Sequence, residues 1–255
     1  MNQVLKVIDD RCSLRRFSPR PIEDEVLNEI LDAAIRAPTA TNRMLYSIIV
    51  VRDQARRDIL AQRCNNQAFI KTAPLILIFV ADQQKHYDFY AAGGVQDFVE
   101  KRGKAFMKPA EHHFLLGVHD ALSAAENAVI AAESLGVGSC YIGHIVSHYE
   151  LNRELFKLPP LAFPITMLVM GYPAEDAVKV RQPRFDKKYV VFDEEYHRLD
   201  SDEIADMYSR FSCPPNNRFD AANSAQYYYM RRYDEDQCYW ESVRSVREAL
   251  KNWKG

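Results

Sequence analysis

Two short basic segments, far apart in the chain, contain the residues best suited to chemistry. The first runs Arg11-Cys12-Ser13-Leu14-Arg15-Arg16-Phe17, and the second runs Lys179-Val180-Arg181-Gln182-Pro183. Guanidinium and ammonium groups form charge-assisted hydrogen bonds with phosphate oxygens, and a Ser hydroxyl adds a neutral donor. We therefore predict that the two segments meet in space and bind one small phosphorylated cofactor.

The composition excludes several other classes of protein. The chain has 255 residues, of which 47% are hydrophobic, enough for a substantial core. Its formal net charge is −2, whereas general nucleic-acid binding requires a broad basic face. The first ten residues include two acids and lack the apolar run of a signal peptide. The longest apolar runs, such as residues 74–81, are too short to span a membrane. We expect no nucleic-acid or membrane partner.

The cysteines and histidines predict neither a disulfide framework nor a metal site. The five cysteines are odd in number and widely spaced, without a Cys-x-x-Cys pair, which favours a reduced, cytoplasmic protein. The histidines that stand close together lack acidic partners at metal-ligand spacing. They are His112, His113 and His119, and further along His144 and His148.

The elements that position the basic segments follow from hydrophobic periodicity and capping signals. We expect helices at about 4–10, 23–35, 53–63, 113–135 and 150–156, and strands at 47–51, 75–81, 140–142 and 165–170. Residues 75–81 are apolar on both faces, which is typical of a buried central strand. Residues 121–132 are apolar almost all round, which places this helix inside the molecule or at a subunit interface.

Helices and strands in this order predict an α+β fold, an α/β sandwich, over residues 1–184. Residues 83–112 form a polar excursion that we expect to be irregular or partly helical. Residues 185–255 are more charged and rich in tyrosine. We interpret them as a helical extension wrapped around a core, and not as an independent domain.

Six sequence blocks, in order, resemble the nitroreductase family of flavin enzymes. The blocks are Arg11–Phe17 with Pro21-Ile22; Ala37–Asn42; Asn66-Gln67 with Ala73-Pro74; Ala131–Gly138 with Tyr141-Ile142-Gly143; Leu158-Pro159 with Gly171-Tyr172-Pro173; and Lys179–Pro183. Gly117-Val118-x-Asp120 and the long extension resemble the branch of NADPH-dependent flavin reductases and oxygen-insensitive nitroreductases.

The resemblance implies a mostly antiparallel mixed sheet flanked by helices, bound FMN, and a homodimer with shared active sites. The extension would wrap the partner subunit, and the Thr39–Asn42 loop would come from that partner. Arg11, Ser13, Arg15, Lys179 and Arg181 would hold the FMN phosphate and ribityl chain. The remaining cofactor contacts implied by the resemblance are Cys12 through its backbone, Gln67, and Tyr141, Ile142, Gly143 and His144 along the flavin ring. No catalytic side chain is implied.

The implied activity is ping-pong transfer of a hydride from NAD(P)H, through flavin N5, to a nitroaromatic, quinone or flavin acceptor. Two alternatives stay open: an FMN-binding carrier or sensor with low turnover, and another flavin reaction such as dehalogenation or dehydrogenation. The sequence departs from the family pattern at Thr39-Ala40 and Met44-Leu45-Tyr46. The choice between NADH and NADPH, the physiological acceptor and the reactivity with oxygen therefore stay open as well. Candidates for contacting the NADPH 2′-phosphate are Arg218, Arg231 and Arg232.

Overall fold

The computed structural model describes residues 1–233 and 237–255. Contacts divide the chain into two compact units, one of residues 1–180 with 240–255, the other of residues 181–239. The sequence suggested a boundary near residue 184 and an extension reaching to residue 255. In the structure, the last sixteen residues pack within the first unit. The side chain of Cys238 lies outside the described residues, and the other four cysteines form no disulfide bond within the described part of the chain.

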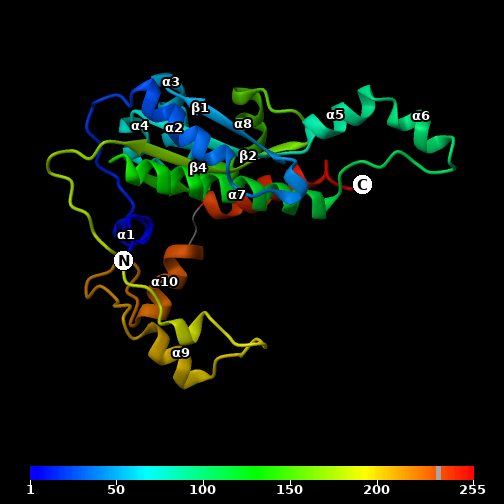
Figure 1. Ribbon diagram of the computed structural model, residues 1–255. Helices are drawn as coiled ribbons and strands as arrows, with labels where there is room; N and C mark the ends of the chain where they lie inside the picture. The colour runs from blue at the N-terminus through cyan, green and yellow to red at the C-terminus, as the bar shows by residue number, and fades with distance from the viewer. Residues whose placement is uncertain (234–236) are drawn as a thin grey trace. The chain divides into compact units, whose positions relative to one another are not determined.

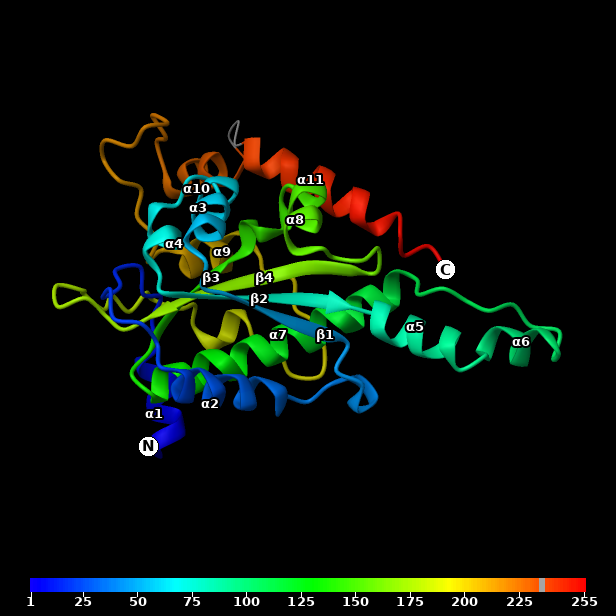
Figure 2. The same ribbon diagram turned by 90° about the horizontal axis from the view of Figure 1, so that it is seen from above.

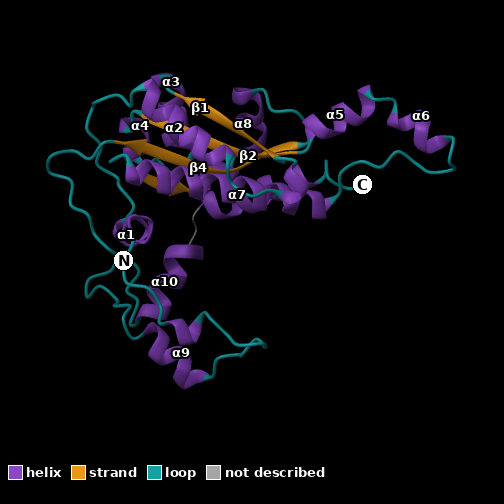
Figure 3. Ribbon diagram, in the orientation of Figure 1, coloured by secondary structure: helices purple, strands orange, loops and turns teal. Residues whose placement is uncertain are grey.

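A four-stranded antiparallel sheet forms the centre of the first unit, in the order β1-β2-β4-β3. Figure 3 shows its strands in orange. The strands are β1 (Tyr46–Val51), β2 (Leu75–Asp82), β3 (Gly138–Ile142) and β4 (Ala162–Gly171). Every residue of β2 is buried, as its apolar sequence predicts. The pairing confirms the predicted α+β fold with a mostly antiparallel sheet. The parallel contribution is an isolated bridge between Ser13 and Ser139, outside the named strands.

Two layers of helices cover the faces of this sheet (Figure 1). Alternate residues of β2 point to opposite faces. Leu75, Leu77 and Phe79 join a cluster with α2 (Asp24–Ile35) and α7 (Glu111–Ser134). Ile76, Ile78 and Val80 join a second cluster with α3 (Gln54–Arg63) and α4 (Ala68–Thr72).

The remaining elements of the first unit surround this sandwich. They are α1 (Gln3–Asp10), η1 (Ala40–Asn42), α5 (Gln84–Ala92), α6 (Val95–Glu100), η2 (Gly143–Val146), α8 (Tyr149–Phe156) and α11 (Gln237–Leu250). Figure 2 shows α5 and α6 extending away from the sheet, so the 83–112 excursion is partly helical as predicted. Trp253, after α11, is buried against Phe114 with ring centroids 5.2 Å apart.

Local sequence signals set the ends of several helices. The side chain of Asp53 accepts a hydrogen bond from the Arg56 backbone N–H and so caps α3, as expected. Gly136 follows α7 with a φ of 76°, a conformation that favours glycine and ends the helix. The described helices include none that is long and apolar enough to cross a membrane.

The second unit contains η3 (Lys187–Tyr189), α9 (Ser201–Tyr208) and α10 (Ser224–Tyr233). Asp200 caps α9 through hydrogen bonds from two backbone N–H groups of the first turn. The unit is held together by aromatic packing, with Phe211 against Tyr208 and Tyr228 at centroid distances of 5.6 Å each. Tyr227 packs on Phe219. Tyr227 and Tyr228 of α10 therefore serve the packing of the extension.

Candidate functional site

The first basic segment lies along β3, the edge strand of the sheet. The backbone N–H of Leu14 donates to the Ser139 carbonyl at 2.9 Å, and Ser13 forms a bridge with the same residue. Three residues later, Phe17 bridges to Pro173 at the end of β4. The segment is therefore fixed along its length, with Cys12 and Leu14 buried and the alternate residues Ser13 and Arg15 exposed.

A glycine permits this close approach. A Cβ built on Gly138 would lie 2.9 Å from the Cβ of Leu14 and 2.4 Å from its Cδ2. Real Cβ atoms essentially never approach other heavy atoms below 3.0 Å. Only a residue without a side chain lets the segment that carries Ser13 and Arg15 dock on β3.

Arg11 and Arg15 bring positive charge to this edge. The Arg15 guanidinium carbon lies 5.9 Å from the Phe69 ring centroid, which places Arg15 beside α4 and its first flanking residue, Gln67. The positive charge of Arg11 is near enough to the Tyr141 hydroxyl of β3 to lower the pKa of that hydroxyl. Within residues 1–233 and 237–255, no carboxylate lies within ion-pair distance of Arg11 or Arg15. Two such cations at one edge suit an anionic ligand.

Lys179 comes from the second basic segment to the same place. Its Nζ donates to Oε1 of Glu133 at 2.6 Å, and this hydrogen bond raises the pKa of Lys179. The nearby Cys12 and Asp10 side chains also raise the pKa of the Lys179 ammonium group. The Glu133 side chain is only 8% exposed, at the C-terminal end of α7. The structure therefore places Lys179 within electrostatic reach of the first basic segment.

Tyr141 is fixed to the helix layer beneath β3. Its hydroxyl donates to Oε2 of Glu126 on α7 at 3.0 Å. Burial, with the nearby Glu126 carboxylate, raises the pKa of Tyr141 well above its ordinary value, so the phenol stays protonated. The hydroxyl is thus used to hold β3 on α7.

Gly143, directly after β3, faces open space. A Cβ added there would meet no heavy atom within 4 Å, in contrast to Gly138. The residue is exposed, while Ile142 before it and Ile145 after it are buried. The backbone at Gly143 thus presents a surface without a side chain, against which a flat ring could lie.

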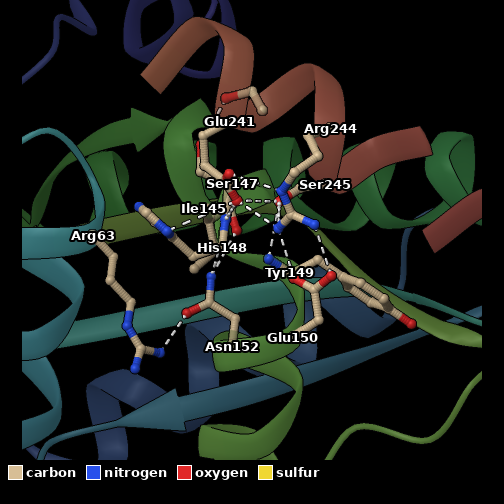
Figure 4. A network of polar contacts seen from close by, with 11 residues as sticks. Arg63, Ile145, Ser147, His148, Tyr149, Glu150, Asn152, Glu241, Arg244 and Ser245 are labelled. Carbon is tan, nitrogen blue, oxygen red and sulfur yellow. Dashed lines mark hydrogen bonds and ion pairs between the residues drawn. The ribbon is translucent and has the colours of Figure 1, made fainter. Parts of the chain in front are cut away.

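A polar network behind this backbone holds η2 in place (Figure 4). The Asn152 side-chain amide donates to the Ile145 carbonyl at 3.1 Å and to the Ser147 carbonyl at 2.8 Å. Arg63 of α3 donates to Oδ1 of Asn152 at 2.9 Å. Asn152 is 1% exposed, so these are buried interactions that fix the turn after Gly143.

Helix α11 completes the network from the C-terminal end of the chain (Figure 4). The His148 backbone N–H donates to Oε1 of Glu241 at 3.1 Å, and the Tyr149 N–H donates to Oγ of Ser245 at 3.0 Å. Arg244 makes two hydrogen bonds of 2.8 and 2.7 Å with the Glu150 carboxylate. This role of α11 could not be predicted from the sequence, because the contacts join residues about ninety positions apart.

The Thr39–Asn42 loop lies elsewhere in the same chain. Asp120 on α7 pins it by accepting hydrogen bonds from the Ala40 N–H at 2.9 Å and from the Leu45 N–H at 3.0 Å. Asp120 and Glu133 are 13 residues apart on α7, which corresponds to roughly 20 Å at about 1.5 Å per residue. Within one chain, the loop and the Lys179 end of the site are therefore separate (Figure 2).

The residues predicted to contact the cofactor thus lie in two separate places in the chain. The structure places Arg11, Cys12, Ser13, Arg15, Tyr141 and Lys179 around β3, and Ile142, Gly143 and His144 lie at or directly after the end of that strand. Gln67 flanks α4, beside which Arg15 lies. The contacts of all these residues with a cofactor stay predictions. The structure does not bring Thr39 and Asn42 to them. Arg181 belongs to the second unit, so its place at this site stays a prediction.

Three of the four acids of α7 are positioning residues that the sequence did not reveal. Glu126, Glu133 and Asp120 hold Tyr141, Lys179 and the Thr39–Leu45 loop, respectively. One signal could have found Asp120: an acid in an otherwise apolar stretch of helix needs a partner. Across the described parts of the chain, no three His, Cys, Asp or Glu side chains gather as metal ligands would.

Comparison with known proteins identifies this arrangement. The model of the nitroreductase family matches residues 8–172. An FMN reductase [NAD(P)H] from Bacillus subtilis is 28% identical over 99% of this chain and 88% of its own length. An NADPH-flavin oxidoreductase from Vibrio harveyi is 31% identical over 80% of this chain and 79% of its own. The structure of NfrA2 from B. megaterium superimposes with a TM-score of 0.79 at 28% identity, covering 100% of this chain and 99% of the other. With its basic segment on β3 and its bare backbone at Gly143, the chain belongs to the nitroreductase family.

Proposed function

We propose that this chain is an FMN-dependent oxidoreductase that takes electrons from NAD(P)H and passes them to nitroaromatic, quinone or flavin acceptors. One observation carries the proposal. Arg11, Arg15 and Lys179 lie around the basic segment docked on β3, and at the end of the same strand the backbone of Gly143 faces open space. A phosphate monoester attached to a flat ring matches both features.

The residues present fit FMN. The phosphate and ribityl chain would be held by Arg11, Ser13, Arg15 and Lys179, and the sequence resemblance implies the same role for Arg181. Gln67 and the backbones of Cys12, Tyr141, Ile142, Gly143 and His144 would contact the rest of the cofactor. When bound, FMN supplies two-electron chemistry, accepting a hydride from NAD(P)H at N5 and reducing the acceptor in a separate half-reaction.

The protein's part is to bind, orient and polarise. The segment of residues 11–15 is hydrogen-bonded to β3, and Asn152 and α11 fix the turn after Gly143, so the ring would lie on a rigid backbone. The positive charges of Arg11, Arg15 and Lys179 favour additional negative charge on the bound group and therefore favour its reduction. No side chain is assigned as a proton donor, because water can supply the proton.

We further propose that the active unit is a homodimer. The Thr39–Asn42 loop lies roughly 20 Å from the Lys179 end of the site in its own chain. It would contribute to a flavin site only from a second copy. Helix α1 also has no buried residue, and its Val4, Leu5 and Ile8 are at least half exposed in the single chain. A second copy would cover these apolar side chains.

A titration tests the proposed activity. Purified protein mixed with FMN should show the flavin absorption bands in the protein fraction after gel filtration. Anaerobic NADH or NADPH should then bleach them, and a quinone or nitro compound should restore them. Binding without turnover would favour the carrier or sensor alternative. Protein that takes up no FMN would contradict the proposal.

Mixed dimers test the shared site. Arg15→Ala and Asn42→Ala dimers should each have low turnover, because each lacks one component of both sites. Unfolding and refolding the two variants together should restore one complete site in each heterodimer. A mixture no more active than its parents, although exchange is shown by mass spectrometry, would argue against the contribution of Asn42 from the partner.

A further inference from the structure

A second pocket lies between the loop that follows η1 and helix α5. Its volume is about 440 Å³, within the range of small-molecule sites. The pocket lining includes Asn42, Arg43, Lys85, His86, Phe89 and Tyr90. They supply two cations and several flat rings, a combination that the cofactor site described above does not use.

Arg43 is the main positive charge of this pocket. Its guanidinium donates to the Tyr90 hydroxyl and lies 5.8 Å from the centroid of that ring. Among the residues that the structure describes, no carboxylate is within ion-pair distance of Arg43. Lys85 is more engaged, because its Nζ donates to the Tyr46 carbonyl at 2.8 Å and lies 3.8 Å from Oδ2 of Asp82. The pocket therefore has uncompensated positive charge.

His86 contributes a neutral ring. Its Nδ1 is shielded from solvent and has no hydrogen-bond partner in the described part of the molecule. Burial lowers the pKa of His86, the Arg43 and Lys85 charges lower it further, and the Asp82 carboxylate opposes them. Phe89 and Tyr90 lie next to it, with centroids 5.8 Å apart and planes inclined by 55°. Phe89 is 70% exposed, so an apolar ring is available at the rim.

The loop that carries Arg43 is held firmly. Thr41, Asn42 and Met44 have φ angles of 52°, 56° and 49°, a region that residues other than glycine rarely adopt. The two hydrogen bonds to Asp120, and one of 3.2 Å from the Met44 N–H to Oγ1 of Thr39, maintain this conformation. Arg43 is thus presented by a fixed backbone, as specific recognition requires.

We propose that this pocket binds the anionic group and ring of an aromatic electron acceptor, and so selects carboxylate-bearing nitro or quinone compounds over neutral ones. Arg43 would pair with the carboxylate, and Phe89, Tyr90 and His86 would stack on the ring. The inference rests on the proposed function, since Asn42 lines this pocket and is the residue expected to reach the partner's flavin. It adds the substrate class to that function.

A pair of matched acceptors tests the proposal. 4-Nitrobenzoate and 4-nitrobenzamide have nearly the same shape and differ in charge. Arg43→Gln should lower kcat/KM for 4-nitrobenzoate about tenfold or more, because a charge-assisted hydrogen bond is lost. The value for 4-nitrobenzamide should stay within about twofold. Arg102→Gln is the control, since Arg102 stacks on Phe98 in the same excursion but outside the pocket. Equal losses for both acceptors, or no loss for either, would overturn the proposal.

Binding measured without turnover separates this proposal from the proposed function. In the NMR spectrum of the FMN-loaded protein, 4-nitrobenzoate should shift the His86 ring signal and raise its pKa, because a carboxylate neutralises Arg43. 4-Nitrobenzamide should shift this signal little. The His86→Gln variant identifies the signal, because the His86 resonance is missing from its spectrum. If no acceptor is turned over but this response is seen, the pocket stands and the enzymatic function fails. If neutral acceptors are reduced but 4-nitrobenzoate leaves the His86 signal unchanged, the pocket proposal fails and the enzymatic function stands.

Discussion

The sharpest prediction concerns a methyl group added at Gly143. Apart from the adjacent backbone, no heavy atom lies within 4 Å of a Cβ built at this position, and the φ of Gly143 lies outside the left-handed region. Gly143→Ala should therefore leave the FMN-free protein as stable as before, or stabilise it by about 0.4–1 kcal/mol through the unfolded chain. If the flavin ring lies on this backbone, however, the methyl occupies its space. Overpacking costs about 1–3 kcal/mol, which corresponds to an FMN dissociation constant raised roughly 5- to 150-fold.

Gly138→Ala is the matched variant with the opposite expectation. Its Cβ would lie 2.9 Å from Cβ of Leu14, well inside ordinary contact. The Leu14 side chain is buried, so the basic segment must move away from β3. We expect a loss of about 1–3 kcal/mol in the free energy of unfolding, already in the FMN-free protein.

Two measurements on each variant separate an effect on FMN binding from an effect on protein stability. Urea unfolding of the FMN-free protein gives the stability, and quenching of FMN fluorescence on titration gives the dissociation constant. The expected result is a loss of affinity without loss of stability at Gly143, and a loss of stability at Gly138. A Gly143→Ala protein that binds FMN as tightly as the original would refute the placement of the ring.

Three further predictions follow from the acids and cations of the site. Lys179→Met should weaken FMN binding about tenfold or more through the loss of one charge-assisted hydrogen bond, and the fluorescence titration measures it; unchanged affinity would exclude Lys179 as a phosphate ligand. Asp120→Ala leaves two backbone N–H groups, of Ala40 and Leu45, without their acceptor and should cost about 1–3 kcal/mol in urea unfolding. An unaffected unfolding midpoint would show that water replaces the carboxylate. Hydrogen bonds from Arg244 lower the pKa of Glu241 to about 2. Because the folded-state pKa is the lower one, the stabilisation by Glu241 is complete above about pH 4.5 and is lost as the pH falls toward 2. Glu241→Gln should flatten that part of the stability–pH curve, and an unchanged curve would assign the acid sensitivity elsewhere.

Much of the site could be predicted from sequence because local signals and a few blocks define it. The strand at 75–81 is apolar on both faces and is central; Asp53 caps its helix; the helix expected at 113–135 is α7. The charges of the two basic segments predicted that they meet, and Lys179 of the second lies within electrostatic reach of Cys12 of the first. Such features depend on residues near one another in the chain or on a motif, so they can be recognised without a structure.

The tertiary structure decided which partner each of these residues has. That Gly138 lets Leu14 approach, that Glu133 holds Lys179, and that Arg43 meets α5 depend on segments far apart in the chain. Composition and periodicity describe one segment at a time, whereas these contacts are set by how β3, α7 and the loops pack around the sheet. The sequence by itself determined the charge, the glycines and the order of the elements. Only the packing determined that Gly138 allows Leu14 to approach β3 closely, whereas Gly143 leaves space in which a flat ring could lie.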